Sequence, residues 1–200
     1  QHYLPHACVT WEFRFAEGQI THDFRENICL PLFLGIDHIW NLINGKNGRL
    51  PIREGAFIND LMAFNEDVIR EALLNAIAHR DYSVTSEVVI KQYPREMIIN
   101  NPGGFPKGVT IENLLTVSST PRSRLMAEVL EKTGLVERSG QGVDKIYAYT
   151  LAEGKPMPSY RDSDMFQVSL KLSGVVEDKA FHIFITEIQK NRKPEEMLGA

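Results

Sequence analysis

Four polar residues suited to binding a ligand lie on a helix predicted over residues 65–83. At about 100° per residue, they fall on one face of that helix: Glu71, Asn75, His79 and Tyr82. Asparagine is a poor residue for the middle of a helix, because its side chain competes for nearby backbone groups. Asn75 therefore indicates a bound ligand, and the alternative is that this face is simply solvated.

Two glycine-containing segments could bring backbone close to the same ligand. Residues 101–104 read Asn-Pro-Gly-Gly after a predicted strand, and residues 140–142 read Gly-Gln-Gly before a predicted helix. A glycine-rich turn at the start of a helix presents free N–H groups that can hold phosphate. Each segment alone is weak evidence for a ligand site, since Pro-Gly is typical of any turn and a lone Gly-x-Gly often binds nothing.

The helix that carries the polar face is well specified by its sequence. Asn65 can cap its first turn, where the charges of Glu66 and Asp67 interact favourably with the helix dipole. The opposite face is apolar and predicts burial against a core. Its residues are Ile69, Leu73, Ala76 and Ile77.

The remaining sequence alternates between strand and helix patterns. Extended segments are predicted over residues 9–15, 24–30, 87–93, 96–100 and 165–172. Helices are predicted over residues 31–45, 120–134, 142–154 and 177–190, with a short one from Thr110 and a loop or short extended run over 47–58. Alternate residues from Val9 to Phe15 are apolar, so the first strand is expected to be half buried.

Composition limits the class of protein. Hydrophobic residues make up 43% of the 200 residues, which suffices for one domain with a fair-sized core. A net charge of -4 argues against a nucleic-acid surface, so DNA contact would need domains absent from this chain. Cys8 and Cys29 fit no metal-ligand spacing and are expected to be reduced, as in a cytoplasmic protein. No signal peptide or membrane-crossing run is present, and we expect no membrane contact.

The order of these motifs resembles that of the GHKL ATPases, the group of gyrase, the histidine kinases and MutL. More closely, the chain resembles the ATPase-like domain at the C-terminal side of bacterial transcriptional regulators related to the RecG helicase. The resemblance rests on residues 70–82, 101–104, 134–137 and 140–142, and it extends over most of the chain. The first motif is specific, and the glycine motifs gain weight from their order and spacing after it.

The resemblance implies a two-layer α/β sandwich of the α+β kind, in which a mixed, mainly antiparallel sheet carries helices on one face. It implies a GHKL-like ATPase domain over residues 1–175. Within it, residues 1–50 form an N-terminal strand and helix segment, and residues 105–139 form a lid insertion. Residues 176–200 are then a C-terminal helix that leads to a domain absent from this chain.

The same resemblance assigns roles to the polar helix face. It implies that Asn75 coordinates Mg²⁺ through its amide oxygen, because Mg²⁺ prefers oxygen ligands and bridges nucleotide phosphates. Glu71 matches the position that orients and activates the attacking water in members that hydrolyse ATP. His79 would lie beside the phosphates or the ribose.

The glycine motifs are implied to hold the two ends of ATP. Gly103 and Gly104 would pass close to the adenine, and the amides of Gly140 and Gly142 would cap the phosphates. The group usually places an aspartate where Asn101 stands, to accept a hydrogen bond from the adenine amino group. An asparagine carbonyl can accept that bond, but its amide can also donate, so purine discrimination changes.

Three further features bear on this resemblance. The second glycine motif lacks another glycine after Gly142, which weakens its grip on phosphate. Lys107, Arg122 and Arg124 lie in the insertion and are candidates for phosphate contact, with solvated surface charge as the alternative. The other histidines show no ligand spacing and are expected to be structural or surface residues: His2, His6, His22, His38 and His182.

These features favour an ATP- and Mg²⁺-binding regulatory domain of a bacterial transcriptional regulator, with slow hydrolysis as an added activity and homodimerisation as an option. One alternative is a degenerate domain of this fold that binds no nucleotide and serves as a scaffold or dimerisation unit. Another is an unrelated α/β domain. A helicase motor is not expected, since the chain has no G-x-x-x-x-G-K-[ST] run.

Overall fold

The computed structural model describes residues 5–54, 56–117, 121–136 and 142–191. Its strands are β1 (Val9–Phe13), β2 (Phe24–Ile28), β3 (Arg49–Glu54), β4 (Phe57–Met62), β5 (Val88–Gln92), β6 (Glu96–Pro102) and β7 (Gln167–Ser173). Its helices are α1 (Leu32–Gly45), α2 (Glu66–His79), α3 (Arg124–Lys132), α4 (Gly142–Ala152) and α5 (Lys179–Asn191).

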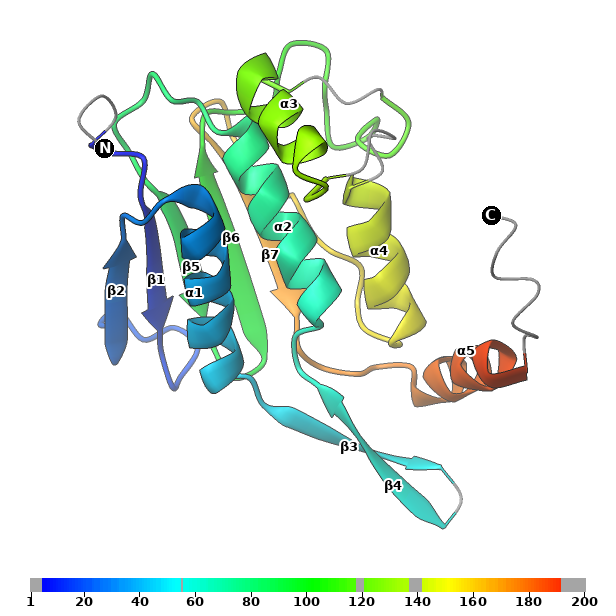
Figure 1. Cartoon of the computed structure of the whole chain (residues 1–200). Coiled ribbons are helices and arrows are strands. Elements are labelled where there is room, and N and C mark those ends of the chain that lie inside the picture. The colour runs from blue at the N-terminus through cyan, green and yellow to red at the C-terminus, as the bar shows by residue number, and fades with distance from the viewer. Residues whose placement is uncertain (1–4, 55, 118–120, 137–141, 192–200) are drawn as a thin grey trace.

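The expected two-layer sandwich is confirmed. Five strands form one sheet in the order β2-β1-β5-β6-β7, in which only the β1–β5 pair is parallel. Helices α1, α2 and α4 lie on one face of this sheet (Figure 1). The core fills the space between sheet and helices, and its fully buried members include Ile69, Leu73, Ile90, Met97 and Ile146.

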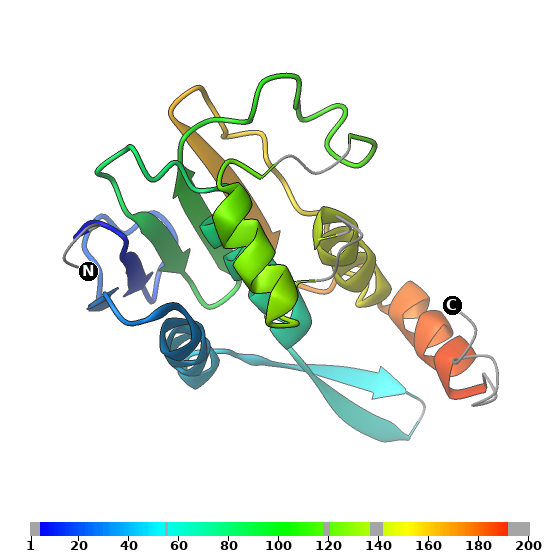
Figure 2. The same ribbon diagram turned by 45° about the horizontal axis from the view of Figure 1, so that its top comes forward.

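A second, smaller cluster holds α3 on the outside of the helical layer (Figure 2). Leu130 of α3 is fully buried against Leu74 and Ile77 of α2 and Ile36 of α1. Ser123 caps α3 by accepting from the Met126 N–H, one turn after the residues expected to open this helix. This packing fixes α3 directly above the helix that carries the polar face.

The first strand differs from its expected half-buried state. All five residues of β1 are buried, because side chains of the neighbouring segments cover the face that carries Thr10 and Glu12. Phe15 lies beyond the strand and is exposed. On the face turned away from the helices, Glu12 pairs with the buried Arg14, and the Thr10 hydroxyl donates to Glu87. The alternation of apolar residues therefore predicted which side chains share a face of the strand, but not that both faces are buried.

Residues 47–58, expected as a loop or a short extended run, are extended and form β3 and the start of β4 in a β-hairpin. Strands β3 and β4 pair antiparallel from Arg49 and Met62 to Glu54 and Phe57, and they extend away from the main sheet (Figure 1). The polar and proline-containing sequence concealed this ribbon, since each strand has little apolar alternation. Phe57, near the hairpin turn, is 76% exposed.

The remaining helix predictions are confirmed with shifted ends. Gly134 and Gly154 have positive φ angles of 71° and 67° and follow α3 and α4, as expected of C-terminal glycines. The short helix from Thr110 is wrong, since residues 110–116 form turns. No helix in the described ranges combines the length and apolar character that crossing a bilayer requires.

The prediction of reduced cysteines is also wrong, because Cys8 and Cys29 form a disulfide. The antiparallel register pairs Val9 with Ile28, so the two cysteines are the next opposed pair along the β1–β2 ladder. Their Cα atoms lie 4.5 Å apart, within the range that a disulfide can bridge. The sequence could not show this pairing, because it depends on which strands are neighbours.

Replacing both Cys8 and Cys29 with serine should lower the free energy of unfolding by about 3 kcal/mol. The bond closes a loop across a sequence separation of 21 residues, and a loop of that order removes about this much unfolded-state entropy. Urea unfolding of the double variant and the oxidised parent measures the difference. Alkylation of two thiols in the native, unreduced parent would contradict the bond.

Candidate functional site

A cavity of about 310 Å³ lies between α2, β6, the start of α4 and the segment after β6. It brings together most of the residues expected to bind a ligand. Those that line it are Glu71, Asn75, His79, Asn101, Gly104 and Gly142. A cavity of this size is typical of small-molecule sites. Gly140 lies outside the described residues.

Helix α2 forms one wall of this cavity because its two faces differ. The Asn65 side chain accepts hydrogen bonds from the N–H groups of Asp67 and Val68, which confirms the expected cap. The apolar face packs on the sheet, while Glu71 and Asn75 are partly exposed toward the cavity. Tyr82 lies after the helix, and its hydroxyl donates to the Ile77 carbonyl, so it supports the helix end.

The first residue of α4 lies directly against the polar face of α2. A Cβ atom added to Gly142 would lie 2.8 Å from Asn75 Nδ2 and would collide with the Glu71 carboxylate. Only glycine allows this approach without displacing the side chains of Glu71 and Asn75. The start of α4, where free N–H groups gather, therefore meets Glu71 and Asn75 at one point.

The end of β6 supplies the other wall. Asn101 is 6% exposed and lines the cavity, and Gly103 follows it with a φ angle of 90°. A Cβ atom at Gly103 would lie 2.7 Å from the Asp81 Cβ, and one at Gly104 would lie 2.6 Å from the Asp164 carbonyl oxygen. These glycines are thus required by close packing of neighbouring backbone. Gly103 lies beside the cavity and does not line it.

Two buried amide atoms of cavity residues have no hydrogen-bond partner among the described residues. They are Nδ2 of Asn75 and Oδ1 of Asn101. A buried polar group without a partner costs about 1–3 kcal/mol, so such groups usually await a ligand or water. An acceptor at Asn101 suits a base amino group, and the donor nitrogen of Asn75 suits a phosphate oxygen, while the amide oxygen of the same side chain is a ligand type that Mg²⁺ accepts. The residues present therefore fit a magnesium-bound nucleotide.

The charge of the cavity is acidic. Three carboxylates line it, from Glu71, Glu131 and Asp144, and its described lining contains no lysine or arginine. Within the described ranges, no group of three or more His, Cys, Asp or Glu could hold a metal by itself. A triphosphate would therefore need Mg²⁺ to offset its charge, with Asn75 and phosphate oxygens among the ligands.

His79 is held neutral at this site. Burial lowers the pKa of its imidazole, and the positive charge of Arg122 lowers it further. The nearby Asp81 carboxyl has its pKa lowered, first by hydrogen bonds from Ser83. A neutral imidazole can donate from one nitrogen and accept at the other, which suits a ribose or phosphate contact.

The three basic residues proposed for phosphate contact have different positions. Arg122 donates to the Gly104 carbonyl and lies 3.4 Å from an Asp81 carboxylate oxygen. It therefore ties the segment before α3 to the end of β6. Lys107 and Arg124 are exposed and are not among the residues that line the cavity.

The apolar wall of the cavity could not be found from the sequence. It combines residues from the segment after β6, the loop before β7 and β7 itself: Phe105, Tyr160, Val168 and Leu170. Phe105 and Tyr160 pack with ring centroids 6.2 Å apart, and burial raises the pKa of the Tyr160 hydroxyl. These residues are distant in sequence and read as ordinary core positions, so no local pattern marks them as ligand contacts.

The remaining histidines lie away from this cavity. His6 contacts the Tyr82 carbonyl, His38 pairs with Glu26, and His182 contacts the Ala152 carbonyl. His22 is exposed, and His2 lies outside the described residues. Structural or surface roles suit the described members of this set.

Comparison with solved structures supports the fold. The DIP2311 protein from Corynebacterium diphtheriae superposes with a TM-score of 0.81 at 23% sequence identity. The match covers 96% of this chain but only 39% of that one, so this chain spans well under half the length of that protein. No protein with a curated description matches the sequence.

A protein-family match covers part of the sequence that forms the site. Residues 85–170 match the family described as "Putative ATP-dependent DNA helicase recG C-terminal". The match runs from the segment before β5 into β7, so it includes the Asn-Pro-Gly-Gly segment and the start of α4 but not α2. In these residues the chain is similar to the ATPase-like C-terminal region of RecG-related proteins.

Proposed function

We propose that this chain binds ATP together with Mg²⁺ and acts as the regulatory domain of a bacterial transcriptional regulator. The main support for this proposal is that Asn75 and Asn101 line the same cavity, and each has a buried amide atom without a hydrogen-bond partner among the described residues. The family match supports nucleotide chemistry at this place in the fold. Asn101 would accept from the base, Nδ2 of Asn75 would donate to a phosphate oxygen, and the amide oxygen of Asn75 would ligate Mg²⁺.

The chain's own residues divide the tasks of binding and hydrolysis. Asn75 and the N–H groups at the start of α4 would orient the phosphates. Glu71 would accept a proton from the attacking water, as a carboxylate at this position can. When bound, Mg²⁺ would neutralise phosphate charge in a cavity whose described lining offers three carboxylates and no basic side chain.

The regulatory part of the proposal concerns neighbouring domains. Occupancy of the cavity would rearrange residues 105–117 and 121–136, parts of which line it, and this change would reach DNA-binding domains outside this chain. We place the regulator in the cytoplasm, as a monomer or homodimer. The Cys8–Cys29 bond is unusual for that compartment, since cytosolic thiols are normally kept reduced.

The alternative function is a scaffold of the same fold that binds no nucleotide. The acidic lining and the tight contact of Gly142 with Glu71 favour it, because both oppose entry of a triphosphate. Calorimetric titration with ATP and Mg²⁺ separates the two functions. Absence of heat and of thermal stabilisation at millimolar ATP would establish the scaffold.

Asn75→Ala should weaken ATP binding by about 10- to 100-fold in the presence of Mg²⁺. Hydrogen bonds to charged groups contribute about 1.5–3 kcal/mol, which corresponds to this range of dissociation constants. Titration calorimetry of the parent and variant measures the loss. Asn41→Ala, at an exposed position of helix α1, is the matched control and should bind as the parent does.

Glu71→Gln should leave ATP binding unchanged and lower steady-state phosphate release by about 10²- to 10⁴-fold, the usual contribution of a general base. A glutamine keeps the size of the side chain and removes its basicity. Glu66→Gln, in the exposed first turn of the same helix, is the control. Equal release rates in the Glu71→Gln variant and the parent would remove Glu71 from hydrolysis.

Asn101→Asp should sharpen the preference for ATP over GTP by about tenfold. A carboxylate accepts from the adenine amino group and repels the guanine carbonyl, whereas an amide can satisfy either base. One net hydrogen bond is worth about 0.5–1.5 kcal/mol, which sets the expected ratio. Competition of ATP and GTP for the parent and variant measures it, and an unchanged ratio would place the base elsewhere.

A further inference from the structure

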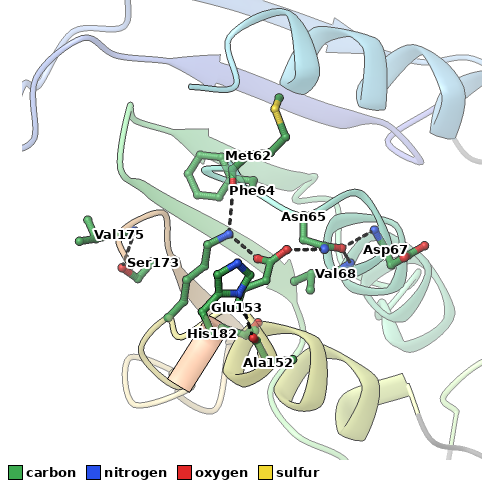
Figure 3. Close-up of polar contacts among 12 residues, drawn as sticks. Met62, Phe64, Asn65, Asp67, Val68, Ala152, Glu153, Ser173, Val175 and His182 are labelled. Atoms are coloured by element: carbon green, nitrogen blue, oxygen red, sulfur yellow. Dashed lines mark hydrogen bonds and ion pairs between the residues drawn. The ribbon is translucent and has the colours of Figure 1, made fainter. Parts of the chain in front are cut away.

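A buried polar network joins the start of α2 to the end of α4, at the ends of these helices away from Asn75 and Gly142 (Figure 3). The Asn65 side chain, which caps α2, also donates from Nδ2 to Glu153 Oε1 at 2.6 Å. Glu153 Oε2 pairs with Lys155 Nζ at 2.5 Å, and that ammonium donates to the Met62 carbonyl at 2.9 Å. We call these four residues the polar clamp.

The clamp is buried and charged, which is unusual in a domain of this size. Glu153 is 9% exposed and Lys155 is 5% exposed. Burial lowers the pKa of the Lys155 ammonium, and the negative charge of Glu153 opposes that change. A buried ion pair is weak evidence for stability, since apolar replacements are often as stable. We therefore look for a geometric role in the parts of the chain that it joins.

That role follows from where the two helices lead. From the clamp, α2 runs toward Asn75, and α4 runs back to Gly142, which contacts Asn75 and Glu71. The path spans ten residues from Asn65 to Asn75 and eleven from Glu153 to Gly142, or about 15–17 Å at 1.5 Å per residue. A turn of about 6° at the clamp would therefore move Gly142 by about 1.5 Å relative to the polar face of α2.

The end of α4 is also fixed to the C-terminal helix. Gly154 has a positive φ angle, and its carbonyl accepts hydrogen bonds from the N–H groups of Glu177 and Asp178. His182 of α5 contacts the Ala152 carbonyl (Figure 3). The clamp is therefore the point at which α2, α4, α5 and the end of the β3–β4 hairpin are held together.

We propose that Glu153 and Lys155 are positioning residues for the nucleotide site, because the polar clamp sets the angle between α2 and α4. This inference rests on the proposed function. The clamp holds α4 so that its first N–H groups face Asn75, and neither charged residue touches the nucleotide. Movement of α5 or the hairpin would reach the site through the same point.

The test uses a double variant, Glu153→Gln with Lys155→Met, which removes both charges without leaving one buried alone. Its control is Glu96→Gln with Lys171→Met, which removes an ion pair on β6 and β7 that is partly exposed. Calorimetry gives the dissociation constant of MgATP, and urea unfolding gives stability. Spin labels at Arg70→Cys and Ala148→Cys, both exposed, report the distance between α2 and α4 with the native disulfide intact.

The clamp variant should unfold at the urea concentration of the parent or above it, yet bind MgATP about 10- to 100-fold more weakly. A misplacement of about 1 Å at a preorganised site can lower a reaction rate on the order of 10²-fold, and we expect the loss of affinity to stay within that range. The label distance should shift or broaden, and the control pair should match the parent in every measurement. A role in stability alone predicts the opposite pattern, with affinity unchanged.

Two results overturn the proposal: an unchanged label distance, or an unchanged dissociation constant in a variant whose distance has shifted. A parent protein that binds no MgATP overturns the proposed function instead. The distance measurement then still decides whether the clamp sets the angle between the helices.

Discussion

The close approach of α4 to α2 is the constraint on which the rest of this structure depends. Gly142 lies so near Glu71 and Asn75 that any larger residue would displace these two side chains. The cavity exists because this contact closes one end of it while β6 closes another. The contact is fixed about 15 Å away by the polar clamp, since two rigid helices transmit their angle along their length.

The sheet provides the frame for this arrangement. Strands β5 and β6 carry the chain from the end of α2 back to the cavity, so Asn101 arrives beside the helix that precedes it. Arg122 and Asp81 then tie the end of β6 to the segment before α3. Arg122 and Asp81 thus join the segment after α2, the end of β6 and the segment before α3, on the side of the cavity that Gly104 lines.

The acidic lining of the cavity gives the site a chemical character of its own. A triphosphate placed against three carboxylates would be repelled, and its magnesium complex, which carries less negative charge, would be repelled less. Neutral His79 adds hydrogen-bonding capacity without adding negative charge. The same features account for the scaffold alternative, because a cavity without bound cation is unfavourable for phosphate.

The sequence by itself determined the local elements and most of the site. The Asn65 cap, the polar face of α2 and the glycines after β6 were readable because each depends on neighbours in the chain. Tertiary structure alone decided the β3–β4 hairpin, the Cys8–Cys29 bond, the apolar wall around Tyr160 and the polar clamp. Each of these joins segments whose proximity is set by strand order and helix packing, and periodicity within a single segment carries no information about its partner.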